Sequence, residues 1–137
     1  MKKSLLFILC AVFAFSLASC SKTSPEAEAK KIATDTLSLF DTATAKLDKA
    51  QSAKEAADAL TAYAADMKVI QDRTNEFQKK NPGFSASTAN TDKELQKKAE
   101  ASAAAFTSAM TKAMMKYAGS KEMLDAVMKI SEMAPKK

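Results

Sequence analysis

The sequence predicts an all-α protein, an up-down bundle of three long helices and a shorter fourth, because helix breakers are rare and regularly placed. Glycine occurs only at positions 83 and 119, and proline only at positions 25, 82 and 135. The stretches between them are rich in Ala, Lys, Glu and Met, which are strong helix formers. Each breaker is therefore expected at or beyond a helix end.

The first helix is expected over residues 25–49. Ser24 supplies a side-chain oxygen for the free N–H groups of the first turn, and Pro25 suits the first helical position, where an N–H has no partner. Small or apolar residues recur every three or four positions, as in an amphipathic helix. They are Ala29, Ile32, Thr36, Phe40, Ala43, Leu47 and Ala50.

A second helix is expected to begin after Ser52. Ser52 and Glu55 match a capping box, in which the serine hydroxyl accepts from the Glu55 N–H while the carboxylate reaches back. Seam positions then step alternately by four and three residues, as in helical bundles and coiled coils. They are Ala56, Leu60, Tyr63, Met67, Ile70, Thr74 and Phe77. Asn81, Pro82 and Gly83 end this helix, whose length of about 29 residues corresponds to roughly 43 Å.

Residues 82–90 form a breaker-rich loop, from which Phe84 is expected to fold back onto the end of the bundle. Thr91 and Glu94 repeat the capping-box pattern and open a third helix. Its predicted inner face contains Leu95, Ala99, Ser102, Phe106, Ala109 or Met110, Ala113 and Tyr117. Gly119 is expected to end this helix, and the alternative is a kink within one longer helix.

The fourth helix is expected to begin after Ser120 and to end before Pro135. Acidic residues in its first turns suit the positive end of a helix dipole. Its predicted apolar contacts are Leu124, Val127, Met128 and Ile130. Because the connections between helices are short, successive helices are expected to run antiparallel.

The expected core combines a seam of alanines with a limited number of large side chains. Positions 43, 56, 99, 103, 109 and 113 are all Ala, which lets helices approach closely but buries little area per contact. Each large side chain contributes about 1.5 to 3 kcal/mol when fully buried. The predicted large contributors are Ile32, Phe40, Leu47, Leu60, Met67, Ile70, Phe77, Leu95, Phe106, Leu124 and Val127.

The amino terminus has the order of an export signal. Lys2 and Lys3 precede an almost unbroken apolar stretch over residues 5–15, and small residues follow it. The stretch is too short to cross a hydrocarbon core of about 30 Å, which takes about 20 helical residues. Residues 17–20, with the sequence Leu-Ala-Ser-Cys, resemble the lipobox of bacterial lipoprotein precursors.

In that family the cysteine thiol becomes a thioether with diacylglycerol, the leader is cleaved, and the new amine is usually acylated with a further chain such as palmitate. The resemblance therefore implies that Cys20 is the lipidation site. At about 0.8 kcal/mol per buried methylene, two or three chains make the attachment to a membrane practically permanent. The implied segments are a signal peptide (1–19), a lipidated tether (20–24), a helical bundle domain (25–134) and a polar tail (135–137).

The alternative for Cys20 is a disulfide in a protein with a plain secretory leader. Cys10 leaves with the leader, so Cys20 has no partner in the mature chain, which favours lipidation. The resemblance implies a cell-envelope protein held to a membrane by its lipidated N-terminus. By the enterobacterial sorting rule, Ser21 in place of Asp favours the outer membrane.

The charge pattern argues against a nucleic-acid partner. Loss of Lys2 and Lys3 with the leader reduces the 21 basic residues to 19, against 16 acidic ones. The remaining charges are interspersed along the chain, whereas nucleic-acid binding requires a basic stripe or patch. Solvated helix faces account for this pattern.

An enzyme is not expected. The sequence contains no His and no Trp, and carboxylates such as Asp48, Asp58 and Asp72 lie off the predicted apolar faces. Without His there is no Glu-x-x-His metal set, and none of the axial histidines of the haem-carrying bundles that the topology resembles in outline. No catalytic residue, metal site or cofactor is therefore predicted.

Methionine crowds the last third of the chain and indicates a binding role, because flexible thioethers suit adaptable apolar contacts. The predicted partner surface comprises Met110, Met114, Met115, Met123 and Met128. The hypothesis is a lipid-anchored binding, accessory or scaffold protein whose partner is another envelope protein. The alternative is a carrier of a small apolar or soft-metal ligand in the bundle core. The regular seams also leave homo-oligomerisation open.

Overall fold

The computed structural model describes residues 24–84 and 93–132. These residues form helices and no strand, which confirms the predicted all-α bundle. The helices are α2 (Pro25–Lys49), α3 (Ala53–Lys80), α4 (Lys93–Lys116) and α5 (Lys121–Glu132). Their lengths of 25, 28, 24 and 12 residues match the expected order of three long helices and a short one.

Some of the sequence predictions lie outside the described residues. These are the leader and the lipobox with Cys20, the predicted cap at Thr91, and the polar tail over residues 135–137. Within the described residues, no helix combines the length and the apolar character that crossing a bilayer requires.

Side-chain caps account for the starts of α2 and α3. The Ser24 hydroxyl accepts a hydrogen bond from the Ala27 N–H at 3.2 Å. The Ser52 hydroxyl accepts from the Glu55 N–H at 3.2 Å, and the Glu55 carboxylate accepts from the Gln51 N–H at 2.9 Å. These bonds satisfy donors that the first turn of a helix leaves free. The predicted capping box is confirmed, with the carboxylate reaching the residue before Ser52.

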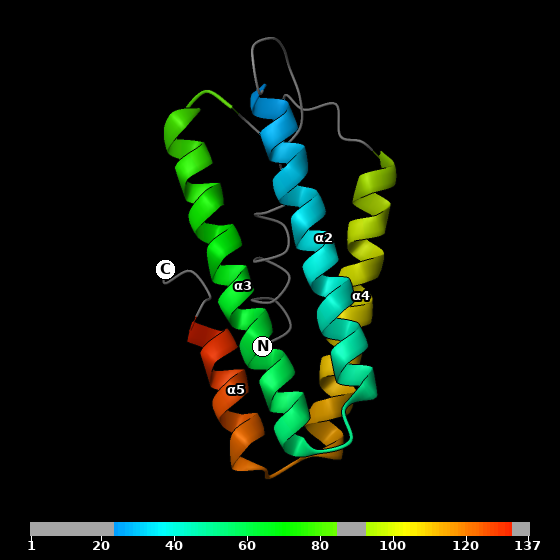
Figure 1. Ribbon diagram of the computed structural model, residues 1–137. Helices are drawn as coiled ribbons and strands as arrows, with labels where there is room; N and C mark the ends of the chain where they lie inside the picture. Colours follow the sequence, from blue (N-terminus) through cyan, green and yellow to red (C-terminus); the bar gives the residue numbers. More distant parts are fainter. Residues whose placement is uncertain (1–23, 85–92, 133–137) are drawn as a thin grey trace.

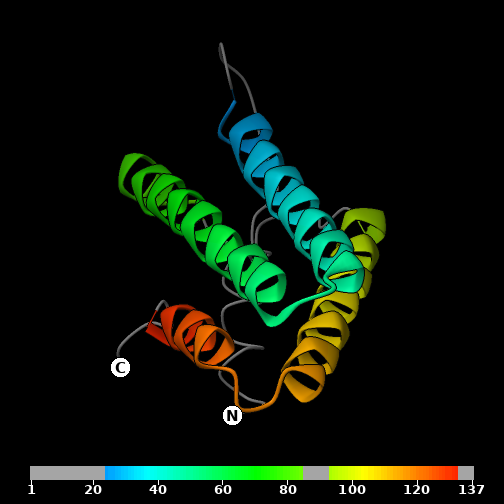
Figure 2. The ribbon, with the colours of Figure 1, turned by 60° about the horizontal axis from the view of Figure 1, so that its bottom comes forward.

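The spatial order of the helices differs from their order in the chain. α2 packs against both α3 and α4, and α5 packs against α3 (Figure 1, Figure 2). α2 and α3 run antiparallel across a short turn, as expected. The third long helix, α4, packs mainly against α2 and not against α3, which precedes it in the chain. The short helix α5 packs mainly against α3. The principal contacts therefore follow the order α4, α2, α3, α5.

The predicted seams form the core of the bundle. All seven predicted positions on α2 and its C-cap and all seven on α3 are buried. The six seam alanines, at positions 43, 56, 99, 103, 109 and 113, are at most 5% exposed. Small side chains at these positions allow the close helix approach that the sequence predicts.

An aromatic cluster joins the three long helices. The ring of Tyr63 on α3 lies 4.3 Å from that of Phe106 on α4, measured between centroids. Phe40 on α2 lies 5.9 Å from Tyr63 and 5.5 Å from Phe106. Aromatic pairs at such distances contribute about 0.5 to 1.5 kcal/mol beyond the area that they bury. Burial in this cluster raises the pKa of the Tyr63 phenol.

The far end of α3 is closed by Phe84, as predicted. The Phe84 N–H donates to the Asn81 carbonyl oxygen at 2.9 Å, which turns the chain back. The Phe84 ring then meets the Phe77 ring edge-on, with 5.1 Å between centroids. Arg73 on α3 also forms a part-buried ion pair with Asp35 on α2 at 2.7 Å.

Some core predictions were wrong. Leu124 and Met128 are 59% and 58% exposed, and Leu95 and Val127 are only partly buried. The buried residues of α5 are Met123, Ala126 and Ile130, so the inner stripe begins one residue earlier than predicted. The predicted stripe with Leu124 and the observed stripe with Met123 are both apolar. The contact with α3 determines which of the two is buried. Ile130 belongs to the core, as expected.

Candidate functional site

The structure divides the methionines of the predicted partner surface by their access to solvent. Met110 and Met123 are 7% and 3% exposed and belong to the core cluster. Met114 is partly buried and packs against that cluster. Met115 and Met128 are 69% and 58% exposed. Of these five, Met115 and Met128, with the accessible part of Met114, lie where a partner can reach them.

Helical spacing explains the division on α4. Ala109, Met110 and Ala113 lie on the buried face of this helix. Successive residues are rotated by about 100° around a helix axis, so Met114 falls at the edge of that face. Met115, two residues beyond Ala113, falls on the outer side, next to the last residue of α4.

An exposed apolar pair lies on α5. Leu124 and Met128 are one turn apart and therefore share a helix face. Both are more than half exposed. The pair adjoins the partly buried Val127, which packs against the core cluster. The apolar surface of α5 thus extends beyond the stripe that its contact with α3 covers.

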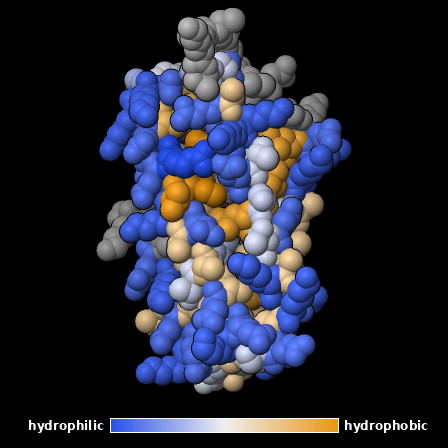
Figure 3. Space-filling model, viewed as in Figure 1, coloured by the Kyte–Doolittle hydropathy of each residue, from blue (hydrophilic) through white to orange (hydrophobic). Residues whose placement is uncertain are grey.

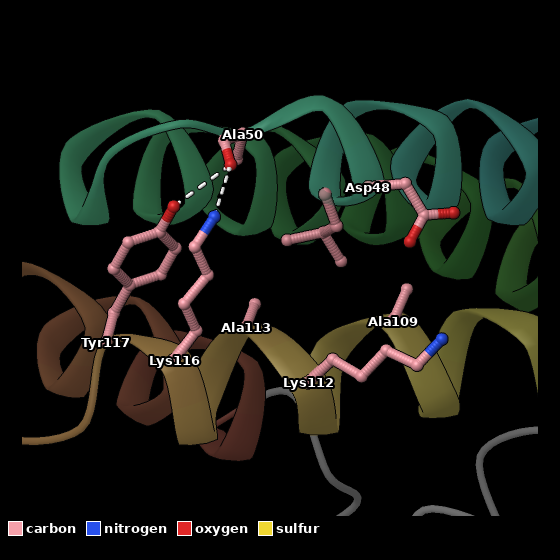
Figure 4. Close-up of a pocket in the computed structure, with 8 residues that line it drawn as sticks. Asp48, Ala50, Ala109, Lys112, Ala113, Lys116 and Tyr117 are labelled. Carbon is pink, nitrogen blue, oxygen red and sulfur yellow. Dashed lines mark hydrogen bonds between the residues drawn. The ribbon is translucent and has the colours of Figure 1, made fainter.

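We define the α4–α5 corner as residues 115–128. It is held to the turn between α2 and α3 by two donors. The Tyr117 hydroxyl donates to the Ala50 carbonyl oxygen at 2.9 Å, and the Lys116 ammonium donates to the same oxygen at 3.3 Å (Figure 4). Lys116 Nζ also lies 5.0 Å from the centroid of the Tyr117 ring. Ala50 follows α2, whose last carbonyl groups lack helical partners and carry the negative end of the dipole, so both donors are stabilising.

A tight turn sets the direction of α5. Gly119 has a φ of 85°, a conformation that a residue with a Cβ adopts only at a cost. The Ser120 hydroxyl then accepts from the Met123 N–H at 3.3 Å and donates to the Glu122 carboxylate at 2.7 Å. A hydrogen bond from the Glu122 backbone N–H, together with that from Ser120, lowers the pKa of the Glu122 carboxyl. The predicted stop and cap are confirmed, and the kinked-helix alternative is wrong.

A small hollow lies beside the corner, between the end of α2 and α4 (Figure 4). Its volume is about 190 Å³, whereas pockets that enclose small-molecule ligands have about 300 to 1,000 Å³. Its walls are Leu47, Asp48, Ala50, Ala109, Lys112, Ala113, Lys116 and Tyr117. The polar groups of Lys116 and Tyr117 are already engaged with Ala50. We interpret the hollow as space left beside the hydrogen bonds that join Lys116 and Tyr117 to Ala50, and not as a ligand site.

Acidic side chains of the described residues lie mostly on the surface. In residues 24–84 and 93–132, no group of three or more His, Cys, Asp or Glu side chains is placed to hold a metal ion. Glu26, in the first turn of α2, is buried, and its Oε1 lacks a hydrogen-bond partner among the described residues. The amphipathic spacing of α2 starts only at Ala29, so the sequence carried no signal for the burial of Glu26.

Comparison with protein families, with curated proteins and with solved structures finds no match. Among the described residues, the exposed apolar side chains of the α4–α5 corner are the feature that points to a binding role.

Proposed function

We propose that the protein is a lipid-anchored binding protein of the cell envelope, an accessory or scaffold protein that presents its α4–α5 corner to another envelope protein. The large hydrophobic residues that are exposed in the described chain are Val69, Met115, Leu124 and Met128. Three of them lie within the 14 residues of the corner.

Because these large apolar side chains are exposed, they do not contribute the free energy that their burial would provide. Burying a Leu or Met side chain contributes about 1.5 to 3 kcal/mol. On the face in Figure 3, the outer sides of the helices are largely hydrophilic, and the strongest hydrophobic colour lies in the upper half, beside α2. A partner that covers the corner would recover this free energy, and flexible thioethers would adapt to its shape.

The lipobox-like residues 17–20 support the anchoring part of the proposal. With lipid on Cys20, the five-residue tether would hold the start of α2 within roughly 17 Å of the bilayer. α2 itself extends for about 37 Å, and its C-cap Ala50 binds the corner through Lys116 and Tyr117. The corner would therefore lie at the opposite end of α2 from the tether, up to roughly 37 Å farther from the membrane.

Metabolic labelling with palmitate tests the anchor, with Cys20→Ser as the control. We expect the wild-type protein to carry label and to have lost residues 1–19 by mass. The variant should remain unlabelled and keep its leader, because lipidation precedes cleavage in the family that the leader resembles. A wild-type protein without label would contradict lipidation and would leave the binding surface to be tested alone.

Photocrosslinking tests the binding surface. A photoreactive residue replaces Leu124 or Met115 in one set of variants and the exposed residues Asp41 or Lys68 in the control set. We expect both corner positions to yield the same discrete adduct, and the controls on α2 and α3 to yield much less. Equal yields from corner and control positions would contradict a binding role for the corner.

We do not extend the proposal to the carrier function. A ligand in the bundle centre would compete with the packed rings of Phe40, Tyr63 and Phe106. Titration with Cu(I) or Ag(I), followed by native mass spectrometry, tests that alternative directly.

A further inference from the structure

The methionines of the described chain include matched pairs of buried and exposed thioethers. On α4, Met110 is 7% exposed, and Met115, five residues later, is 69% exposed. On α5, Met123 is 3% exposed, and Met128, again five residues later, is 58% exposed. Met67 on α3 is 2% exposed. Each exposed methionine therefore has an internal control on its own helix.

The difference in exposure between these methionines matters because a thioether can be oxidised by hydrogen peroxide. A sulfur lone pair attacks one oxygen of hydrogen peroxide, so that an S–O bond forms and the O–O bond breaks. Sulfur is oxidised to the sulfoxide, and the peroxide is reduced to water. The oxidant has to reach the sulfur, so a buried thioether reacts only when local or global unfolding exposes it.

We infer that Met115 and Met128 form a surface oxidation site, whose two thioethers hydrogen peroxide converts to sulfoxides in the folded protein. Met67, Met110 and Met123, which are buried, oxidise more slowly under the same conditions. The inference rests on the exposure of the side chains and is independent of the proposed function.

The position of the two sulfurs decides what oxidation does to the protein. Met115 lies on the outer side of α4, and Met128 lies one turn from the exposed Leu124. A sulfoxide at either position adds a polar group to the surface and displaces nothing in the core. A sulfoxide at Met110 or Met123 would instead place that group among buried apolar residues. Oxidation of the site therefore makes the corner more polar while the bundle remains folded.

This change of polarity also deepens the proposed function, on which its biological meaning rests. A partner held by apolar contacts at the corner would bind the oxidised protein more weakly. Peroxide would then act as a negative regulator of the interaction.

The test is a time course of the mature protein in excess hydrogen peroxide, quenched with free methionine and mapped after trypsin digestion. Cleavage after lysine separates Met110 (peptide 99–112) from Met114 and Met115 (peptide 113–116). Met123 and Met128 share peptide 122–129 and are distinguished by fragment ions. Each sulfoxide adds about 16 Da, the mass of one oxygen.

We expect Met115 to react at least about tenfold faster than Met110, and Met128 at least about tenfold faster than Met123. In concentrated urea the rates within each pair should become equal, which controls for intrinsic reactivity. Rates within twofold of one another in the folded protein would overturn the inference, as would a buried methionine that reacts first.

Variants separate the surface site from damage to the fold. Met115→Leu with Met128→Leu should remove both fast oxygen additions and leave the melting temperature within a few degrees, whereas Met110→Leu should keep both. Oxidised wild-type protein should melt close to the reduced protein, and a large loss of stability would overturn the assignment to the surface. If both sulfurs oxidise but the crosslinking yield at Leu124 stays unchanged, the oxidation site stands and its role in partner binding fails.

Discussion

The two central helices and the C-terminal helix differ in how many neighbours cover them. α2 lies mainly against α3 and α4, α3 lies mainly against α2 and α5 and also meets α4 through the Tyr63 and Phe106 rings, and α5 has its principal contact with α3. Ten of the 25 residues of α2 and ten of the 28 of α3 are buried, against three of the 12 of α5. A helix with two neighbours buries a wide stripe of residues, so a predicted stripe that is displaced by one residue still falls largely within the core. On α5, which has one main neighbour, the same displacement places Leu124 in solvent.

Truncation of the aromatic cluster is expected to have the largest effect. Phe40 is 2% exposed and touches the rings of Tyr63 and Phe106, so Phe40→Ala should lower the free energy of unfolding by about 3 to 5 kcal/mol. Leu124→Ala is the matched control on α5 and should change it by less than about 0.5 kcal/mol. Chemical denaturation measures both. Similar decreases in the free energy of unfolding for the two variants would contradict the difference between the aromatic cluster and the exposed face of α5.

The attachment of α5 is the next test. Met123→Ala removes a buried contact of α5 and should weaken its docking by about 2 kcal/mol. Hydrogen exchange should then accelerate at α5 amides while the amides of α2 and α3 keep their protection, because α5 opens as a local unit. Met128→Ala on the exposed face should leave exchange unchanged. Uniform acceleration across all helices would show that α5 unfolds only with the bundle.

Alkaline pH should destabilise the centre of the bundle through Tyr63. Burial raises the pKa of its phenol above the ordinary value of 10.0, so the folded state favours the neutral form. This contribution is fully present below pH 10 and is lost as the pH rises above 10, at about 1.4 kcal/mol per pH unit. The difference in thermal stability between wild type and Tyr63→Phe should therefore change in favour of the variant above pH 10. A difference that does not depend on pH would contradict this coupling.

The cap of α3 is expected to have the smallest of these effects. Ser52→Ala removes the acceptor of the Glu55 N–H and should cost about 1 kcal/mol in the free energy of unfolding. Ser38→Ala, at an exposed position within α2, is the control and should be neutral or slightly stabilising. Equal effects of the two changes on the denaturation midpoint would show that the cap contributes nothing measurable.

The sequence predictions were most accurate for features that depend on residues close together in the chain or on a pattern that repeats many times. Ser24, Ser52, Ser120 and Gly119 act within a few residues of their own positions, and all four are placed as predicted. The seam of α3 was also predicted completely, because its spacing repeats over seven positions.

The candidate site was only partly predictable. Methionine content pointed to the C-terminal third, but the separation of Met115 and Met128 from Met110 and Met123 required the packing of α4 and α5. The bonds from Lys116 and Tyr117 to Ala50 join residues 66 and 67 positions apart, and no local pattern announces them.

The sequence by itself determined four helices, the caps at Ser24, Ser52 and Ser120, the stop at Gly119 and the alanine seam, because these features follow from local backbone preferences and the helical repeat. Only the tertiary structure decided that α4 returns to α2, that α5 lies on α3, and that Leu124, Met115 and Met128 face outward. The physical reason is that α5 carries two apolar stripes within only 12 residues, and local spacing does not select between them. The choice among them depends on which neighbour is present.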